Sequence, residues 1–137
     1  MDYDVNIDNK NKVVLCTCRG MLDLSSAKSM TRDVRKRAYE LGYGLLYDVA
    51  NLSLGVGITD AYCFPRDMEN IYEEFIHRRG RAAIVYKSDK DFWKFFKTTA
   101  RNAGVNVVLF CEIEEALEWL GCKWGSGQDK HLITKDM

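Results

Sequence analysis

Histidine and cysteine are the residues most often used for nucleophilic catalysis and metal binding, and this sequence of 137 residues holds two histidines and five cysteines. Neither His77 nor His131 lies at ligand spacing from a cysteine or a carboxylate, and no Cys-x-x-Cys pair occurs. His77 falls near the expected C-terminal end of a helix, where the helix dipole stabilises an imidazolium. The sequence therefore predicts no metal site, no cofactor and no enzyme activity.

Cys16 and Cys18 are two residues apart in a run that is typical of a β-strand. Both side chains should therefore point to the same face of a sheet. They could form a redox pair, or they could pack as small apolar residues. We expect them to pack in the core.

The segment from Asn51 to Thr59 follows a predicted strand and contains Gly55 and Gly57. Closely spaced glycines before a helix can bring backbone amides near a phosphate, but the third glycine and the Lys-Ser/Thr of a P-loop are missing here. The segment instead predicts a long loop at the C-terminal end of a strand, where α/β proteins often place their sites. We therefore expect the loop up to Asp60, with the helix after it, to bind a partner.

Four aromatic residues occupy five consecutive positions, from Phe92 to Phe96. One buried helix stripe would take Phe92 and Phe96, so Trp93 and Phe95 widen the apolar face. Either this helix lies between the sheet and a neighbouring helix, or part of its aromatic surface is open to a ligand. The candidates for contact with an apolar ligand, held between this helix, the helix at 68–76 and the sheet, are Tyr62, Phe64, Tyr72, Phe92, Trp93 and Phe96.

These residues must be positioned by the strands and helices that apolar periodicity predicts. Alternation over Tyr3–Asp8 and a second apolar run over Val13–Cys18 indicate a β-hairpin. Further strands are expected at 44–49, 82–86 and 105–110. Helices are expected from Asp23 or Ser25 to Gly42, from Met68 to near Gly80, from a capping-box-like start at 88–91 to Ala103, and at 112–120, with a short helical turn before Pro65.

The order of these elements predicts an α/β domain over residues 1–121. It should contain a five-stranded mixed, mainly parallel sheet flanked by about four helices, with the N-terminal hairpin providing an antiparallel edge strand. Residues 122–137 lose periodicity and are expected to form a flexible C-terminal tail. The edge strand Tyr3–Asp8 could pair with a second copy in a homodimer, although its aspartates are charges that protect an edge.

Charge and hydropathy limit which classes of partner and which cellular compartment we expect for this protein. Twenty Lys and Arg balance twenty Asp and Glu, so no broad field of one sign is available for nucleic acid or an anionic membrane surface. No apolar run is long enough to span a membrane, and the N-terminus lacks a secretory signal, so we expect a cytoplasmic protein. The basic group formed by Arg32, Arg35, Lys36 and Arg37 is expected to be a solvated helix face, which could also dock an acidic partner helix.

Several segments, taken in order, resemble one known family. They are the leading hairpin, Tyr47-Asp48, the run 59–65 (Thr-Asp-Ala-Tyr-Cys-Phe-Pro), the run 81–85 (Arg-Ala-Ala-Ile-Val), Val108-Leu109-Phe110 and the run 115–120. Together they resemble the SpoIIAA-like family of the STAS domains, whose fold is related to that of the Sec14 or CRAL-TRIO lipid-binding domains. The resemblance implies a small bacterial cytosolic regulatory module that binds a protein or a small ligand and is not an enzyme.

The resemblance also implies a site and a partner. In anti-sigma factor antagonists, a strand that ends in Asp is followed by a loop and an Asp-Ser-Ser-Gly-like helix start, whose Ser is phosphorylated by an anti-sigma-factor kinase. Asp48 matches the strand-end Asp, but no Asp-Ser-Ser-Gly follows, and the nearest hydroxyls are Ser53 and Thr59. The candidates for partner binding or phosphorylation are therefore Asp48, Ser53, Thr59 and Asp60.

Two hypotheses of different classes remain open on the sequence. The first is a non-catalytic protein-interaction module whose partner resembles an anti-sigma-factor kinase. The second is a module that binds an apolar or lipid-like small molecule among the aromatic residues.

Overall fold

A computed structural model describes residues 1–75 and 81–121. The strands are β1 (Asp2–Asp8), β2 (Val13–Leu22), β3 (Gly44–Leu54), β4 (Arg81–Val85) and β5 (Asn106–Phe110). The helices are α1 (Leu24–Leu41), α2 (Ile58–Asp67), α3 (Glu69–Glu74), α4 (Lys90–Asn102) and α5 (Ile113–Gly121). The predicted tail at 122–137, and with it Cys122 and His131, lies outside the described residues, as does His77.

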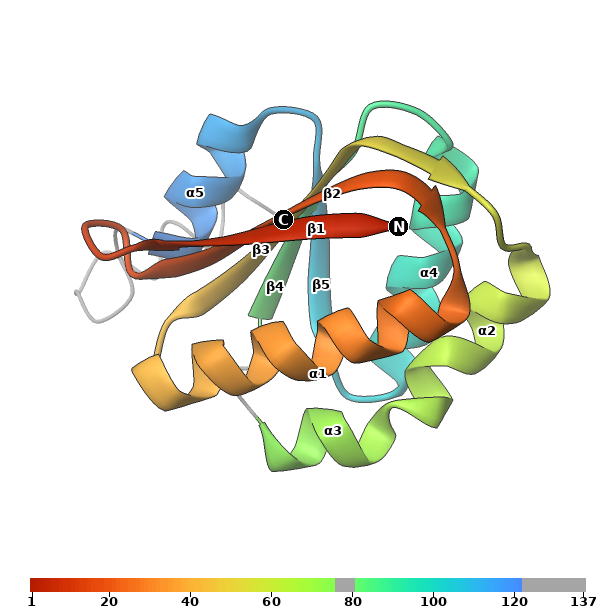
Figure 1. Ribbon diagram of the computed structural model, residues 1–137, viewed down its shortest axis with the longest axis horizontal. Helices are drawn as coiled ribbons and strands as arrows, with labels where there is room; N and C mark the ends of the chain where they lie inside the picture. Colours follow the sequence, from red (N-terminus) through yellow and green to blue (C-terminus); the bar gives the residue numbers. More distant parts are fainter. Residues whose placement is uncertain (76–80, 122–137) are drawn as a thin grey trace.

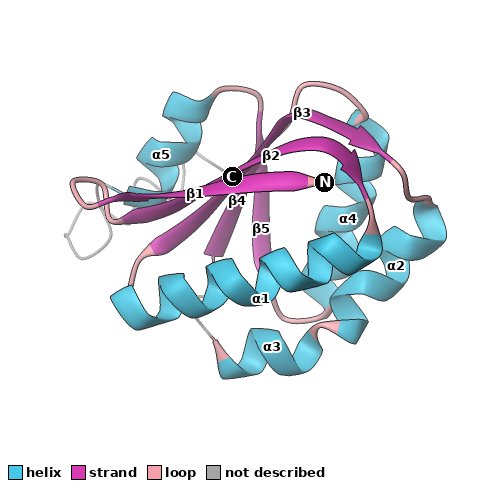
Figure 2. Ribbon diagram, viewed as in Figure 1, coloured by secondary structure: helices cyan, strands magenta, loops and turns pink. Residues whose placement is uncertain are grey.

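The strands form one sheet in the order β1-β2-β3-β4-β5. The hairpin strand β1 is antiparallel to β2, and the three other pairings are parallel. Helices α1 to α4 lie on one face of this sheet and α5 lies on the other (Figure 1; Figure 2). The predicted α/β fold is confirmed. The described residues form five helices instead of about four, because the short helical turn expected before Pro65 is a ten-residue helix, α2.

Alternation along β3 builds a core on each face of the sheet. Leu45, Tyr47 and Val49 pack in the larger cluster with α1, α2 and α4. Leu46 packs with Trp119 in a smaller cluster under α5. Both faces of the central strand are therefore buried, as expected for a strand in a mainly parallel sheet.

The ends of β2 and β3 differ from the prediction. Strand β2 continues through Gly20, whose φ of +88° suits a residue without a Cβ, and β3 continues to Leu54. The two extensions pair with each other, so the first four residues of the expected loop at 51–59 are strand. The prediction of a long loop was wrong because the period-two spacing of Leu52 and Leu54 outweighs the turn-forming residues around them.

Gly55 is required where these two strands end. A Cβ at this position would lie 2.6 Å from the Leu22 carbonyl oxygen and 2.7 Å from Met21 Cγ. The backbone of the short 55–57 connection can therefore approach β2 closely only with glycine here.

Helix α1 begins and ends as the sequence predicts. The Asp23 carboxylate accepts a hydrogen bond of 2.8 Å from the Ser26 backbone N–H, and Gly42 ends the helix at φ +70°. Helix α4 also has the expected extent, but its predicted capping box is absent. Asp89 has φ +62° and its side chain makes no capping hydrogen bond.

Helix α2 continues past Pro65 instead of ending before it. Pro65 has no N–H, so the Ala61 carbonyl loses its usual helical donor. The Thr99 hydroxyl of α4 lies 2.9 Å from this carbonyl oxygen and 3.0 Å from the Phe96 carbonyl oxygen of its own helix, and its one proton is shared between the two acceptors. This contact between helices explains how α2 tolerates a proline that the sequence pattern alone marks as a helix end.

Within the described ranges, none of the helices combines the length and the apolar character that crossing a bilayer requires.

Replacing Thr99 by valine should destabilise the fold because the buried Ala61 carbonyl is left without its donor. We expect the free energy of unfolding to fall by about 1–3 kcal/mol. Thr98→Val is the matched control, since the exposed Thr98 hydroxyl bonds only within its own helix, to the Lys94 carbonyl. Urea denaturation measures both variants, and equal effects would contradict the proposed role of Thr99.

Replacing Asp23 by asparagine should reduce the acid sensitivity of the fold. The Ser26 N–H lowers the pKa of Asp23 below its usual value. The ionised Asp23 carboxylate therefore stabilises the fold above the pKa that Asp23 has in the unfolded chain, about 3.9. This stabilisation is lost as pH falls through the lower pKa of Asp23 in the folded chain. Asparagine keeps the capping oxygen without titrating. Thermal unfolding from pH 6 to pH 2 should show a smaller loss in melting temperature for the variant than for the parent.

Candidate functional site

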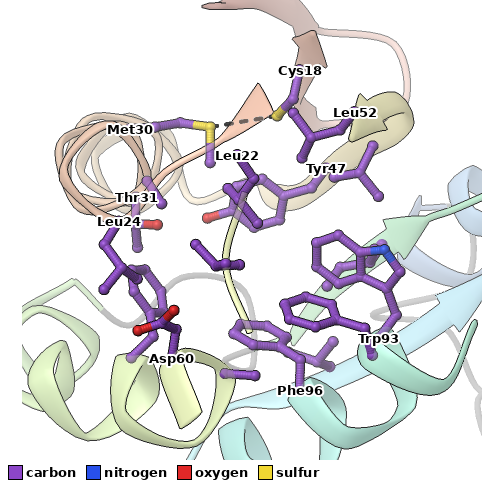
Figure 3. A pocket seen from close by; sticks show the side chains of 18 of the residues that line it. Cys18, Leu22, Leu24, Met30, Thr31, Tyr47, Leu52, Asp60, Trp93 and Phe96 are labelled. Atoms are coloured by element: carbon purple, nitrogen blue, oxygen red, sulfur yellow. Dashed lines mark hydrogen bonds between the residues drawn. The ribbon is translucent and has the colours of Figure 1, made fainter. Parts of the chain in front are cut away.

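A deep apolar pocket lies where α1, α2 and α4 face the sheet (Figure 3). The space not filled by protein atoms measures about 750 Å³, including the part open to solvent. The volume that the centres of water-sized molecules can occupy is about 80 Å³. By the second measure, one buried water molecule needs only about 10–15 Å³. The wall is formed by Cys18, Leu22, Leu24, Ala27, Met30, Thr31, Arg35, Tyr47, Val49, Leu52, Val56, Asp60, Ala61, Phe64, Ile84, Phe92, Trp93, Phe96 and Val107.

An irregularity in β3 shapes the sheet side of this pocket. Thr17 pairs with Asp48 and Arg19 pairs with Asn51, so three steps along β3 match two along β2. A bulge of this kind changes the alternation of side chains. Val49 and Leu52, three residues apart, consequently both line the pocket.

Asp48 stabilises the bulge. Its carboxylate accepts a hydrogen bond of 3.1 Å from the Ala50 backbone N–H. Asp48 does not belong to the pocket wall. Asp48 therefore lies inside β3 rather than at its end, and its part in partner binding stays a prediction.

Aromatic rings form the side of the pocket opposite β2. Trp93 packs edge-to-face on Phe92 and on Phe96, with centroids 5.0 and 5.9 Å apart. Phe64 of α2 lies 6.1 Å from Phe96. Figure 3 shows Tyr47, Trp93 and Phe96 converging on the hollow. Four of the six aromatic residues proposed for an apolar ligand thus share one wall, and their contact with a ligand stays a prediction.

The other two aromatic candidates differ. Tyr62 is 48% exposed and lies outside the pocket wall, with the Arg66 guanidinium 5.3 Å from its ring centroid. Arg66 also donates a hydrogen bond of 3.2 Å to the Tyr62 hydroxyl. The side chain of Tyr72 is outside the part of the chain that the structure describes.

The proposed loop candidates do not form one cluster around the pocket. Ser53 is exposed and donates a hydrogen bond of 3.2 Å to the Gly20 carbonyl. Thr59 is exposed in the first turn of α2. Only Asp60 lines the pocket, and its carboxylate accepts a hydrogen bond of 3.0 Å from the Gly57 N–H at the start of α2.

Arg35 is the site residue that the sequence analysis placed wrongly. It is 4% exposed and lines the pocket together with Thr31 of the same helix, although its neighbours suggested a solvated basic face. The spacing held a signal, because Arg35 is four residues after Thr31 and follows the buried Val34. It also places one guanidinium in a wall that is otherwise mostly apolar.

The pocket wall offers a binding surface with few reactive groups. Across the described ranges, no group of three or more His, Cys, Asp and Glu side chains is arranged to hold a metal ion. The wall combines aromatic and aliphatic side chains with the polar groups of Thr31, Arg35 and Asp60. Such a composition suits an apolar molecule with one polar end.

No protein-family model matches the sequence, and no curated protein matches it either. The fold does match a solved structure, described as that of an uncharacterized protein from the DUF3478 family with a SpoIIAA-like fold, from Shewanella loihica. The TM-score is 0.52 at 14% sequence identity, and the match covers 87% of this chain and 92% of that one. The chain therefore has a SpoIIAA-like fold, as its sequence resemblance implied.

Proposed function

We propose that the chain is a non-catalytic binding module that holds a small, largely apolar molecule in the pocket between α1, α2, α4 and the sheet. The composition of the wall carries the proposal. Of the nineteen residues around the hollow, Thr31, Arg35, Tyr47 and Asp60 carry a hydroxyl or a charge, and most of the others are aliphatic or aromatic. Ligand pockets are usually lined by apolar and aromatic side chains with a few polar groups that orient the ligand.

The shape of the wall favours a ligand with a flat or flexible apolar body. Phe92, Trp93 and Phe96 present ring surfaces from α4, and Val49 and Leu52 present branched side chains from β3. Burial of apolar surface against these groups contributes about 25 cal/mol per Å². An alkyl chain or an aromatic ring system of modest size meets this description.

The polar groups support a ligand with one polar end. The Arg35 guanidinium carries several N–H donors in a planar fork. The Asp60 carboxylate is half-buried and already bonded to the Gly57 N–H. A carboxylate or hydroxyl at one end of the ligand would have donors on the α1 side of the pocket.

The described wall residues lack a histidine to act as a base, and this favours binding over catalysis. None of the described wall residues is a histidine, and the thiol of Cys18 and the hydroxyl of Thr31 therefore have no imidazole base there.

Phe96→Ala should weaken binding of a twelve-carbon alcohol or fatty acid by about tenfold or more, because burial of an aromatic side chain is worth about 1.5–3 kcal/mol. Phe95→Ala is the matched control. Phe95 is a half-buried neighbour on α4 that packs against the core and does not line the pocket. Titration calorimetry with dodecan-1-ol and dodecanoate measures both affinities.

Absence of binding by the parent chain across chains of eight to sixteen carbons, together with a ligand-free mass in native mass spectrometry, would contradict the proposal. An equal loss in the Phe95 and Phe96 variants would place the ligand elsewhere.

A protein partner is the second candidate function, and one surface feature favours it. Met21 is 61% exposed and lies against Gly55, at the short connection between β3 and α2. The exposed Ser53 and Thr59 flank the same connection. An exposed apolar side chain beside hydroxyl groups suits contact with another protein, including a kinase of the anti-sigma-factor class.

Met21→Lys should abolish capture of such a partner while leaving dodecanol binding unchanged. Ile7→Lys is the control, because Ile7 is also an exposed apolar residue, 38% against 61% for Met21, and lies on the edge strand β1. Affinity capture followed by mass spectrometry identifies a protein that binds the Ile7→Lys variant but not the Met21→Lys variant. Capture of the same proteins by both variants would exclude this surface.

A further inference from the structure

The outer side of α4 carries a line of positive charge. Its members follow one another at intervals of four, three and four residues and are Lys90, Lys94, Lys97 and Arg101. At 3.6 residues per turn they lie within about 60° of the helix circumference and extend over about 16 Å. We name these four residues the cationic stripe.

The cationic stripe is accessible to an anionic partner. Three of its members are exposed and Lys97 is half-buried. None of the four forms an ion pair with another described residue. The two carboxylates closest in sequence, Asp89 and Asp91, stand at the start of α4, and Asp91 lies about 100° around the helix from Lys90. The stripe therefore keeps a continuous positive edge along the length of α4.

The fold places negative charge on the opposite side of the molecule. Residues 112–121, which include α5, contain four exposed glutamates and no lysine or arginine. Helices α4 and α5 cover opposite faces of the sheet (Figure 1). The balance of charge over the whole chain, which predicts no broad field of one sign, therefore does not describe the surface around α4. With its charges separated in this way, the chain turns its α4 side toward an anionic surface.

The composition of the stripe distinguishes among anionic partners. A specific protein interface usually has an apolar centre, and a site for single-stranded nucleic acid adds aromatic rings that stack on bases. All four aromatic side chains of α4 are buried or half-buried, so the stripe presents charge without an exposed ring. A membrane with anionic lipids requires only positive charge, and each Lys or Arg near its surface strengthens binding by about fivefold.

The choice of a lipid surface also rests on the proposed function of the pocket. Phe92, Trp93 and Phe96 line the pocket from the inner side of the same helix. An apolar ligand is more concentrated in a bilayer than in water, because transfer of apolar surface out of water is favourable. We propose that the chain docks reversibly on membranes containing anionic phospholipid, with the cationic stripe against the headgroups.

Co-sedimentation with lipid vesicles tests the docking. The parent chain should bind vesicles of phosphatidylcholine with about one-third phosphatidylserine at about 0.1 M salt, where the Debye length is about 10 Å. It should be released at about 1 M salt, where the Debye length is about 3 Å. Vesicles of phosphatidylcholine alone should not bind it at either salt concentration.

Lys94→Gln combined with Lys97→Gln should weaken binding to the phosphatidylserine vesicles by about 25-fold, because two cations leave the stripe. The matched control combines Lys10→Gln with Lys36→Gln, which changes the net charge equally at exposed positions outside α4. The control should lose no more than about twofold, because charges more than about 10 Å from the headgroups are screened. Circular dichroism checks that both double variants are folded.

Equal losses in the two double variants, binding to phosphatidylcholine alone, or binding that survives 1 M salt would overturn the proposal. Tighter binding to a short DNA duplex than to the vesicles, at the same phosphate concentration, would overturn the choice of a lipid surface.

Dodecan-1-ol binding, measured without vesicles, separates this proposal from the proposed function. A parent chain that binds dodecan-1-ol but not the phosphatidylserine vesicles contradicts the docking alone. A parent chain that binds the vesicles but not dodecan-1-ol supports the docking and contradicts the pocket ligand.

Discussion

The parallel pairing of β2 with β3 is the interaction on which the other features of this structure depend. It extends from Val13 opposite Gly44 to Leu22 opposite Leu54. Strand β4 pairs with β3 only as far as Asp48. The outer halves of β2 and β3 therefore form a two-stranded extension beyond the central sheet, and this extension must be covered by helices on its apolar face.

The ends of this extension determine where the covering helices begin. Asp23 caps α1 directly after β2, and Gly57 precedes α2 three residues after β3. Helix α2 is then fixed against α4 through the Thr99 contact with the Ala61 carbonyl. The pocket lies between these helices and the sheet, so its walls are set by strand pairing and helix contacts rather than by a flexible loop.

The fold was largely predictable from the sequence because its signals are local. The alternation of the hairpin strands, the buried stripe of α1 and the glycine that ends it each follow from nearby residues. The spacing of the aromatic residues of α4 also indicates a shared apolar surface without reference to their partners.

The errors arise where a distant contact decides the local structure. Pro65 marks a helix end by itself, and only Thr99, 34 positions later, explains why α2 continues. Arg35 carries a charge that favours solvent, and only the packing of α1 on the sheet shows that it is buried. The strand at 51–54 depends likewise on pairing with β2. Single-sequence reasoning has no access to these contacts.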